Sequence, residues 1–260
     1  MVLSREELVF KAKVCEQTER FEDMLELMKT LITEHSQELS VEERNLLSVA
    51  YKNSVGPRRS AWRVLVSLEN KEESKPQAHT NLLKEYKAKV EKELESICTE
   101  IINFLETKLI PGAQKAKAAI SNPGVNNKDW IALAETEIFY LKMKGDYFRY
   151  ISEFSGESNK TSADKAEEAY AAATAVANNG LKKTNPIRLG LALNFSVFYY
   201  EVRNDPTKAC KLAKSAFDEA IADIESLEEG EYKDATTILQ LIRDNLTLWT
   251  SELEEQDSQK

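Results

Sequence analysis

The chain has 260 residues, 42% of them hydrophobic, and is therefore long enough to bury a substantial core. Glycine occurs only 8 times and proline 6 times, which disfavours strand-and-turn folds and glycine-rich nucleotide loops. Lys and Arg number 35 against 44 Asp and Glu, and the resulting net charge of −9 argues against nucleic-acid binding and against binding to anionic membranes.

The cysteines and the N-terminus both indicate a cytoplasmic protein. Cys15, Cys98 and Cys210 are odd in number and far apart, without a C-x-x-C pair, so we expect buried, reduced thiols. The first residues are charged rather than apolar, and no run approaches 18 apolar residues. A signal peptide and a membrane span are therefore not expected.

Apolar residues recur at intervals of three and four along almost the whole chain, which predicts an all-α fold. The predicted helices occupy residues 5–18, 21–35, 41–70, 78–108, 129–154, 162–180, 186–203, 206–227 and 232–253. The third, fourth and fifth are long, so we expect antiparallel hairpins stacked side by side.

Three helix starts are marked by capping residues. Ser40 precedes Glu43 in a capping-box pattern, while Asn185 and Asp205 each stand directly before a proline. A capping side chain followed by proline is typical of a helix N-terminus.

Two segments depart from the regular pattern. Residues 114–129 contain the turn cluster 121–127, so we expect one or two helical turns followed by a surface loop. Residues 255–260 are acidic and polar, and we expect a short flexible tail.

The sequence carries no motif for metal, cofactor or catalytic chemistry. The two histidines, His35 and His79, lie outside the helical zinc and di-iron motifs, and the common nucleotide-binding and nucleophile motifs do not occur. We therefore expect no metal, no cofactor and no enzymatic activity.

A basic stretch stands out in this acidic chain. Residues 44–68 contain no acidic side chain, and Lys52, Arg59 and Arg63 would share one stripe of a helix. Such a stripe suits an anion, although a solvated basic face paired with acidic neighbours has the same pattern. Pro57 lies inside the same predicted helix, where it usually bends the axis.

A second pair of cations, Lys142 and Arg149, is also seven residues apart. Asp146 lies four residues after the first and three before the second, so it is well placed to hold both side chains. An anion site and an ordinary helical ion pair both fit this spacing.

Two amides lie on helix faces that carry apolar residues. Asn194 shares a face with Val197 and Glu201 in an apolar helix, and Asn245 lies among Leu241, Ile238, Leu248 and Trp249. Two such amides can clamp an extended peptide backbone, because each both donates and accepts. A hydrogen-bonded core asparagine is the alternative interpretation.

Four stretches of the sequence resemble the 14-3-3 protein family. Residues 44–53 (RNLLSVAYKN) and 232–251 (YKDATTILQLIRDNLTLWTS) closely resemble its two signature stretches, and residues 140–147 and 186–201 are similar to further family segments. The likeness extends over nearly the whole chain.

The resemblance implies a cup-shaped subunit of nine antiparallel helices with a concave amphipathic groove, and a single domain over residues 1–254. It implies an adaptor that binds phosphoserine or phosphothreonine peptides of client proteins. The implied phosphate-binding residues are Lys52, Arg59, Arg149 and Tyr150. The implied peptide-binding residues are Lys142, Leu193, Asn194, Val197, Glu201, Leu241, Asn245, Leu248 and Trp249.

The resemblance also implies a homodimer, or a heterodimer with a paralogue. The implied dimer contacts are Val14, Thr18, Arg20, Asp23, Tyr86, Lys89 and Glu93. The sequence departs from the family at Pro57, Ala61 and Ala235, and by an insertion over residues 114–131.

One alternative function remains open from the residues alone. Residues 186–227 are similar to one tetratricopeptide unit, and stacked helix pairs of that kind form concave peptide-binding walls. The alternative is a helical-repeat-like scaffold that binds peptides without phosphate dependence.

Overall fold

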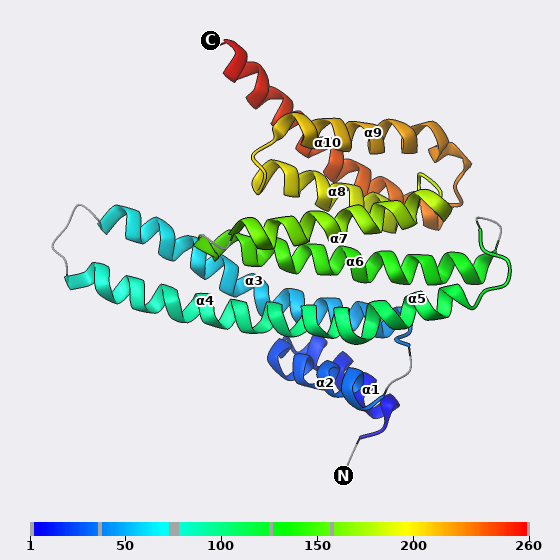
Figure 1. Ribbon diagram of the computed structural model, residues 1–260, viewed down its shortest axis with the longest axis horizontal. Helices are drawn as coiled ribbons and strands as arrows, with labels where there is room; N and C mark the ends of the chain where they lie inside the picture. Colours follow the sequence, from blue (N-terminus) through cyan, green and yellow to red (C-terminus); the bar gives the residue numbers. More distant parts are fainter. Residues whose placement is uncertain (1–2, 36–37, 73–77, 125–126, 157–158, 259–260) are drawn as a thin grey trace. The chain divides into compact units, whose positions relative to one another are not determined.

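The computed structural model describes residues 3–35, 38–72, 78–124, 127–156 and 159–258, and these residues form helices without any strand (Figure 1). The all-α prediction is confirmed. The chain divides into two compact units, Met1–Thr107 and Lys108–Lys260, and each is described by itself.

The first unit contains four long helices. They are α1 (Arg5–Gln17), α2 (Phe21–Glu34), α3 (Val41–Glu72) and α4 (Ala78–Phe104). Within this unit α1 packs on α2 and α3, α2 packs on α3, and α3 packs on α4. Leu8, Met28 and Leu94 are almost fully buried, as is Tyr51, whose hydroxyl donates to Glu100 at 2.9 Å. The apolar faces of these helices therefore meet in one core, which also contains a buried tyrosine whose hydroxyl is hydrogen-bonded.

The second unit is built from the remaining helices. They are α5 (Ile110–Ala118), α6 (Lys128–Phe154), α7 (Asn159–Gly180), α8 (Pro186–Glu201), α9 (Pro206–Asp223), the short 3₁₀ turn η3 (Ile224–Ser226) and α10 (Glu229–Ser258). The most extensive packing joins α6 and α7, which run side by side in Figure 1. Further contacts join α8 to α9, and α10 to both of them.

Small residues allow α6 and α7 to approach closely. A Cβ atom on Gly145 would lie 2.8 Å from the ring of Tyr170, and one on Gly180 would collide with the indole of Trp130. Both glycines are therefore needed for the close packing of aromatic rings between these helices.

The three helix starts marked in the sequence are confirmed. The Ser40 hydroxyl accepts from the Glu43 amide at 3.2 Å, and the Glu43 carboxylate accepts from the Ser40 amide at 2.7 Å. The side chains of Asn185 and Asp205 each accept from amides in the first turn of α8 and α9. These bonds satisfy donors that a helix N-terminus otherwise leaves unpaired.

The predicted end of the fourth helix at residue 108 is wrong. Residues 78–118 are helical without a break, because α4 continues through the π-helical turn η1 (Leu105–Leu109) into α5. Pro111 stands at the start of α5, directly after the register change of the π turn, where its missing N–H costs the helix little. Counted as one, this stretch gives nine helices in the described residues, the predicted number.

Residues 114–118 are helical and a loop follows them, as expected, but the C-terminal segment differs from expectation. Helix α10 continues to Ser258, so residues 255–258 of the expected flexible tail are helical, since Glu and Gln favour helices. Residues 259–260, and residues 125–126 of the turn cluster, lie outside the described residues.

The three cysteines are unpaired, as predicted, but only Cys98 is buried. Cys15 and Cys210 are half-buried, so the expectation of three buried thiols is wrong for two of them. Both lie on helices that keep part of one face open to solvent.

Candidate functional site

Asp146 of α6 is the centre of a polar cluster in the second unit. Its carboxylate accepts a hydrogen bond from the Lys142 ammonium at 2.9 Å and lies 3.7 Å from the Arg149 guanidinium. The Tyr170 hydroxyl donates to it at 2.5 Å, and the Asn194 amide nitrogen donates to its two oxygens at 2.8 and 3.1 Å. The predicted role of Asp146 in holding both cations is therefore confirmed.

Burial alone would raise the pKa of Asp146. The charges of Lys142 and Arg149 and the hydrogen bond from Tyr170 oppose that effect, and the net result is a pKa below the ordinary value. Asp146 is therefore a buried carboxylate that stays ionised at neutral pH.

The Arg149 guanidinium is held in one orientation by neighbours from three helices. Its Nε donates to the Tyr170 hydroxyl at 3.3 Å and its Nη1 to Glu201 of α8 at 3.3 Å, while its guanidinium carbon lies 4.9 Å from the centre of the Tyr150 ring. Burial opposes the charged form, but Tyr170 and Asp146 favour it and raise the pKa of Arg149 above its ordinary value. The result is a permanent, pre-oriented cation.

Glu201 is the partner of Arg149 that reaches solvent. The Glu201 side chain is 45% exposed, whereas those of Arg149 and Asp146 are 9% and 10% exposed. An external anion can replace Glu201 while the interactions of the guanidinium with Tyr170 and Asp146, which orient it, remain in place.

Asn194 is half-buried rather than a fully buried core residue. Its amide nitrogen donates to Asp146, so its side-chain carbonyl is the group that can accept from an external N–H donor. Leu193 and Val197, on the same helix, are also half-buried.

Helix α10 packs against α8 and carries exposed apolar residues. Leu241 and Leu248 are 50% and 53% exposed, and Asn245 is half-buried. Trp249 is only 3% exposed, and its ring stacks on Tyr200 of α8 with centroids 4.8 Å apart. Trp249 thus fixes α10 on α8, while the two leucines face solvent.

The basic stretch lies on α3 of the first unit. The helix continues unbroken through Pro57. Lys52 is exposed and Arg59 is half-buried, seven residues further along the same helix.

Two cations of this stretch do not match a solvated anion-binding stripe. Arg44 is buried, and Arg58 donates to Glu93 at 3.0 Å and to the Ser54 carbonyl at 2.7 Å. For Arg58, the interpretation as a cation paired with acidic neighbours is correct.

The residues expected at a dimer contact all lie in the first unit. Val14 and Tyr86 are 43% and 56% exposed, and Thr18 and Lys89 are also exposed. The other three, Arg20, Asp23 and Glu93, form hydrogen bonds with residues of the same chain. Arg20 donates to Asp23 at 2.5 Å, and Glu93 accepts from Arg58.

Tyr170 is the member of this polar cluster that the sequence did not point to. It is the only aromatic residue in the alanine-rich helix α7, and a lone aromatic among alanines is the signal that could have drawn attention to it. Phe10 of α1 and Leu82 of α4 are 68% and 62% exposed, and neither is among the residues expected at a dimer contact.

The described residues were also compared with what a metal site and a membrane-spanning helix require. Within the part of the chain that the structure describes, no cluster of His, Cys, Asp and Glu is arranged to hold a metal ion. The helices described there include none with the length and apolar character needed to cross a membrane.

Comparison with known proteins gives a consistent result over both units. The protein-family model described as "14-3-3 protein" matches residues 11–250. The checkpoint signal transducer rad24 of Schizosaccharomyces pombe is 54% identical over 253 residues, which cover 96% of this chain and 87% of that protein.

Two plant proteins are similar to nearly the same extent. The 14-3-3-like protein G-BOX factor 14 kappa of Arabidopsis thaliana is 52% identical over 258 residues, covering 98% of this chain and 97% of that protein. The 14-3-3-like protein A of Vicia faba is 51% identical over 254 residues, covering 96% and 90%.

Proposed function

Because the chain belongs to the 14-3-3 family, whose members are adaptor proteins in signal transduction rather than enzymes, we propose that it binds phosphoserine or phosphothreonine segments of client proteins and regulates them as a dimer. The observation that carries the proposal is the Arg149 guanidinium, oriented by Asp146 and Tyr170 and paired at its open side with Glu201.

A phosphate group suits this arrangement physically. It carries a charge near −2 and accepts charge-assisted hydrogen bonds from arginine, each contributing about 1.5–3 kcal/mol when shielded from water. Arg149 is already ordered, so little side-chain entropy is lost on binding. An unphosphorylated serine would offer no charge to replace Glu201.

In this proposal four residues bind the phosphate. They are Arg149 and Tyr150 of α6 and Lys52 and Arg59 of α3. Variants of Arg59 and of Arg149 test the two pairs separately.

The rest of the peptide would contact α8, α10 and Lys142. The amides of Asn194 and Asn245 would bind its backbone, and Glu201 and Trp249 would add polar contacts. The apolar wall would consist of Leu193, Val197, Leu241 and Leu248. Hydrogen bonds to the peptide backbone would contribute affinity, and the apolar contacts would contribute specificity.

Dimerisation would place two such sites in one particle. A client with two phosphorylated segments would then bind more tightly, because the second segment binds at a high effective concentration. We propose a cytoplasmic location, which agrees with the three unpaired cysteines.

Fluorescence anisotropy of a labelled phosphoserine peptide and its unphosphorylated twin tests the proposal. The wild type should bind only the phosphorylated peptide, and Arg59→Ala and Arg149→Lys should each weaken binding by at least about tenfold. Lys128→Ala is the control, because Lys128 is an exposed cation at the start of α6. Equal binding of both peptides would favour the phosphate-independent scaffold instead.

A further inference from the structure

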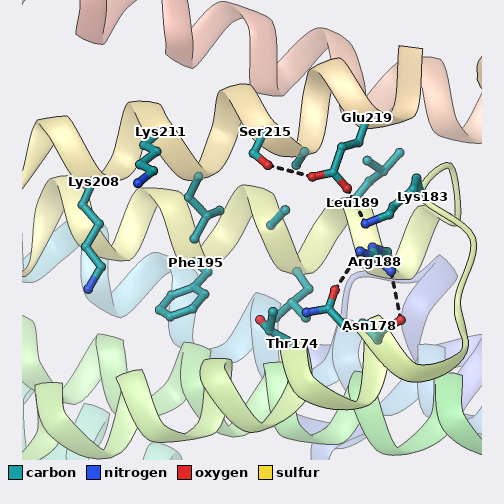
Figure 2. A pocket seen from close by; sticks show the side chains of 15 residues that line it. Thr174, Asn178, Lys183, Arg188, Leu189, Phe195, Lys208, Lys211, Ser215 and Glu219 are labelled. Atoms are coloured by element: carbon teal, nitrogen blue, oxygen red, sulfur yellow. Dashed lines mark hydrogen bonds and ion pairs between the residues drawn. The ribbon is translucent and has the colours of Figure 1, made fainter. Parts of the chain in front are cut away.

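A cavity lies between α7, α8 and α9 (Figure 2). Its volume is about 780 Å³, within the range of pockets that hold small molecules. Its apolar lining includes Leu191, Ala192, Phe195, Leu212 and Ala216.

This cavity is separate from the proposed peptide site. Arg188, Ala192 and Phe195 face the cavity from α8 at helical spacing. At about 100° per residue, Val197 points to the opposite side of the same helix, and Asn194 points about 100° or more away from each of these three residues. A ligand in the cavity therefore need not compete with a peptide.

Cations outnumber carboxylates around the cavity. Lys183, Arg188, Lys208 and Lys211 line it, and Glu219 is the one carboxylate among the lining residues described. Figure 2 shows Lys208 and Lys211 near one end and Lys183 and Arg188 near the other. The chain as a whole has a net charge of −9, whereas the residues that line this cavity carry a net positive charge.

Two of these cations are not neutralised by a direct ion pair. Arg188 donates to neutral oxygens, at 2.7 Å to Asn178 and at 3.0 Å to the backbone carbonyls of Ala177 and Leu181. Burial lowers the pKa of Arg188, and only the more distant charge of Glu219 opposes this. Lys211 is exposed and makes no ion pair with the described residues.

The other two cations already have acidic partners. Lys183 pairs with Glu219, which also accepts from Ser215 at 2.8 Å. The Lys208 ammonium lies 3.6 Å from Glu167 and 4.0 Å from the centre of the Tyr199 ring. Lys211 is thus the lining cation left to bind a new anion.

We infer that this cavity binds a small amphipathic anion, with an aromatic or short alkyl body and one carboxylate, sulfonate or phosphate group. The body contacts Phe195, Leu212 and Ala216, where it is removed from water. The anionic group pairs with Lys211, at the end of the cavity where Lys208 also lies (Figure 2).

The probe for the test is 8-anilinonaphthalene-1-sulfonate, an amphipathic anion whose fluorescence rises in apolar surroundings. Titration of the full chain should give saturable binding. Lys211→Glu should weaken that binding by about tenfold, and Ala216→Phe should weaken it at least as much by filling the cavity.

Lys214→Glu is the matched control. Lys214 lies on the same helix, is 72% exposed and pairs with Asp218 at 3.3 Å, and it does not line the cavity. Its replacement should change binding by less than about twofold. Equal effects of Lys211→Glu and Lys214→Glu, or no effect of Ala216→Phe, would overturn the inference.

A competition experiment separates the two sites. A phosphoserine peptide at saturating concentration should leave the bound probe in place, because none of its proposed contact residues lines the cavity. Complete displacement of the probe by that peptide would overturn the inference, since the probe would then occupy the peptide site.

Discussion

Tyr170 donates its hydroxyl hydrogen to Asp146 at 2.5 Å, and the same hydroxyl accepts from the Arg149 Nε at 3.3 Å. One phenol from α7 therefore connects the buried carboxylate of α6 to the arginine that it orients. Burial and the adjacent Asp146 charge raise the pKa of Tyr170, so the hydroxyl keeps its hydrogen.

Removal of this hydroxyl should weaken phosphopeptide binding. Tyr170→Phe leaves the ring but breaks both bonds, so Arg149 loses part of its orientation, and we expect about a fivefold to tenfold rise in Kd. Tyr199→Phe is the control, because its hydroxyl donates to Glu167 instead, at 2.8 Å. Calorimetric titration with one phosphopeptide measures both variants, and equal affinities would argue against a positioning role for Tyr170.

The depressed pKa of Asp146 predicts how stability depends on pH. The folded state favours the ionised carboxylate of Asp146, so this carboxylate contributes to the free energy of unfolding. The contribution is complete above the pKa of an Asp in the unfolded state, about 3.9. It is lost as the pH falls through the lower pKa of Asp146 in the folded state. Asp146→Asn removes the titrating group and should be destabilised at pH 7.

Urea denaturation of wild type and Asp146→Asn between pH 7 and pH 3 measures this contribution. The difference in unfolding free energy should be constant down to about pH 5 and should narrow below about pH 4. A difference that stays constant to pH 3 would mean that Asp146 is not stabilised as the anion.

A buried ion pair joins α6 to residues 114–131, the segment that we expected to be an insertion. Glu137 of α6 is 4% exposed, forms an ion pair with Lys117 of α5, and accepts from Gln114 at 3.0 Å. Lys117→Met would leave the Glu137 charge without its cation, and we expect a loss of about 3 kcal/mol in unfolding free energy. Lys115→Met, at an exposed position of the same helix, should cost less than about 0.5 kcal/mol.

The proposed dimer depends on exposed apolar residues of the first unit. Tyr86→Glu should shift the chain from dimer to monomer, because a charge would replace a ring that is 56% exposed in the single subunit. Tyr232→Glu on α10, where the ring is 47% exposed, should leave the assembly unchanged. Sedimentation velocity distinguishes the two, and a wild-type monomer at micromolar concentration would contradict the proposal.

Local sequence signals predicted most helix bounds, because those bounds depend on local chemistry. Ser40, Asn185 and Asp205 cap helices through bonds to their own first turns, which spacing alone reveals. The sequence did not predict that the fourth helix continues past residue 108, because a proline usually interrupts a helix. Here the π turn Leu105–Leu109 precedes Pro111, and the chain stays helical.

The polar cluster was only partly predictable. Lys142, Asp146 and Arg149 are neighbours on one helix, so their spacing identified the ion pairs. Tyr170 and Asn194 come from other helices, and their bonds to Asp146 depend on tertiary packing that no local pattern encodes.

A crystal structure of the full chain with a bound phosphoserine peptide would show directly whether Arg149 binds the phosphate. We expect a phosphate oxygen within about 3 Å of the Arg149 guanidinium. We also expect that the Arg149–Glu201 pair opens while the bonds of Arg149 and Asp146 to Tyr170 persist. A phosphate bound elsewhere, with Arg149 still paired to Glu201, would contradict the account.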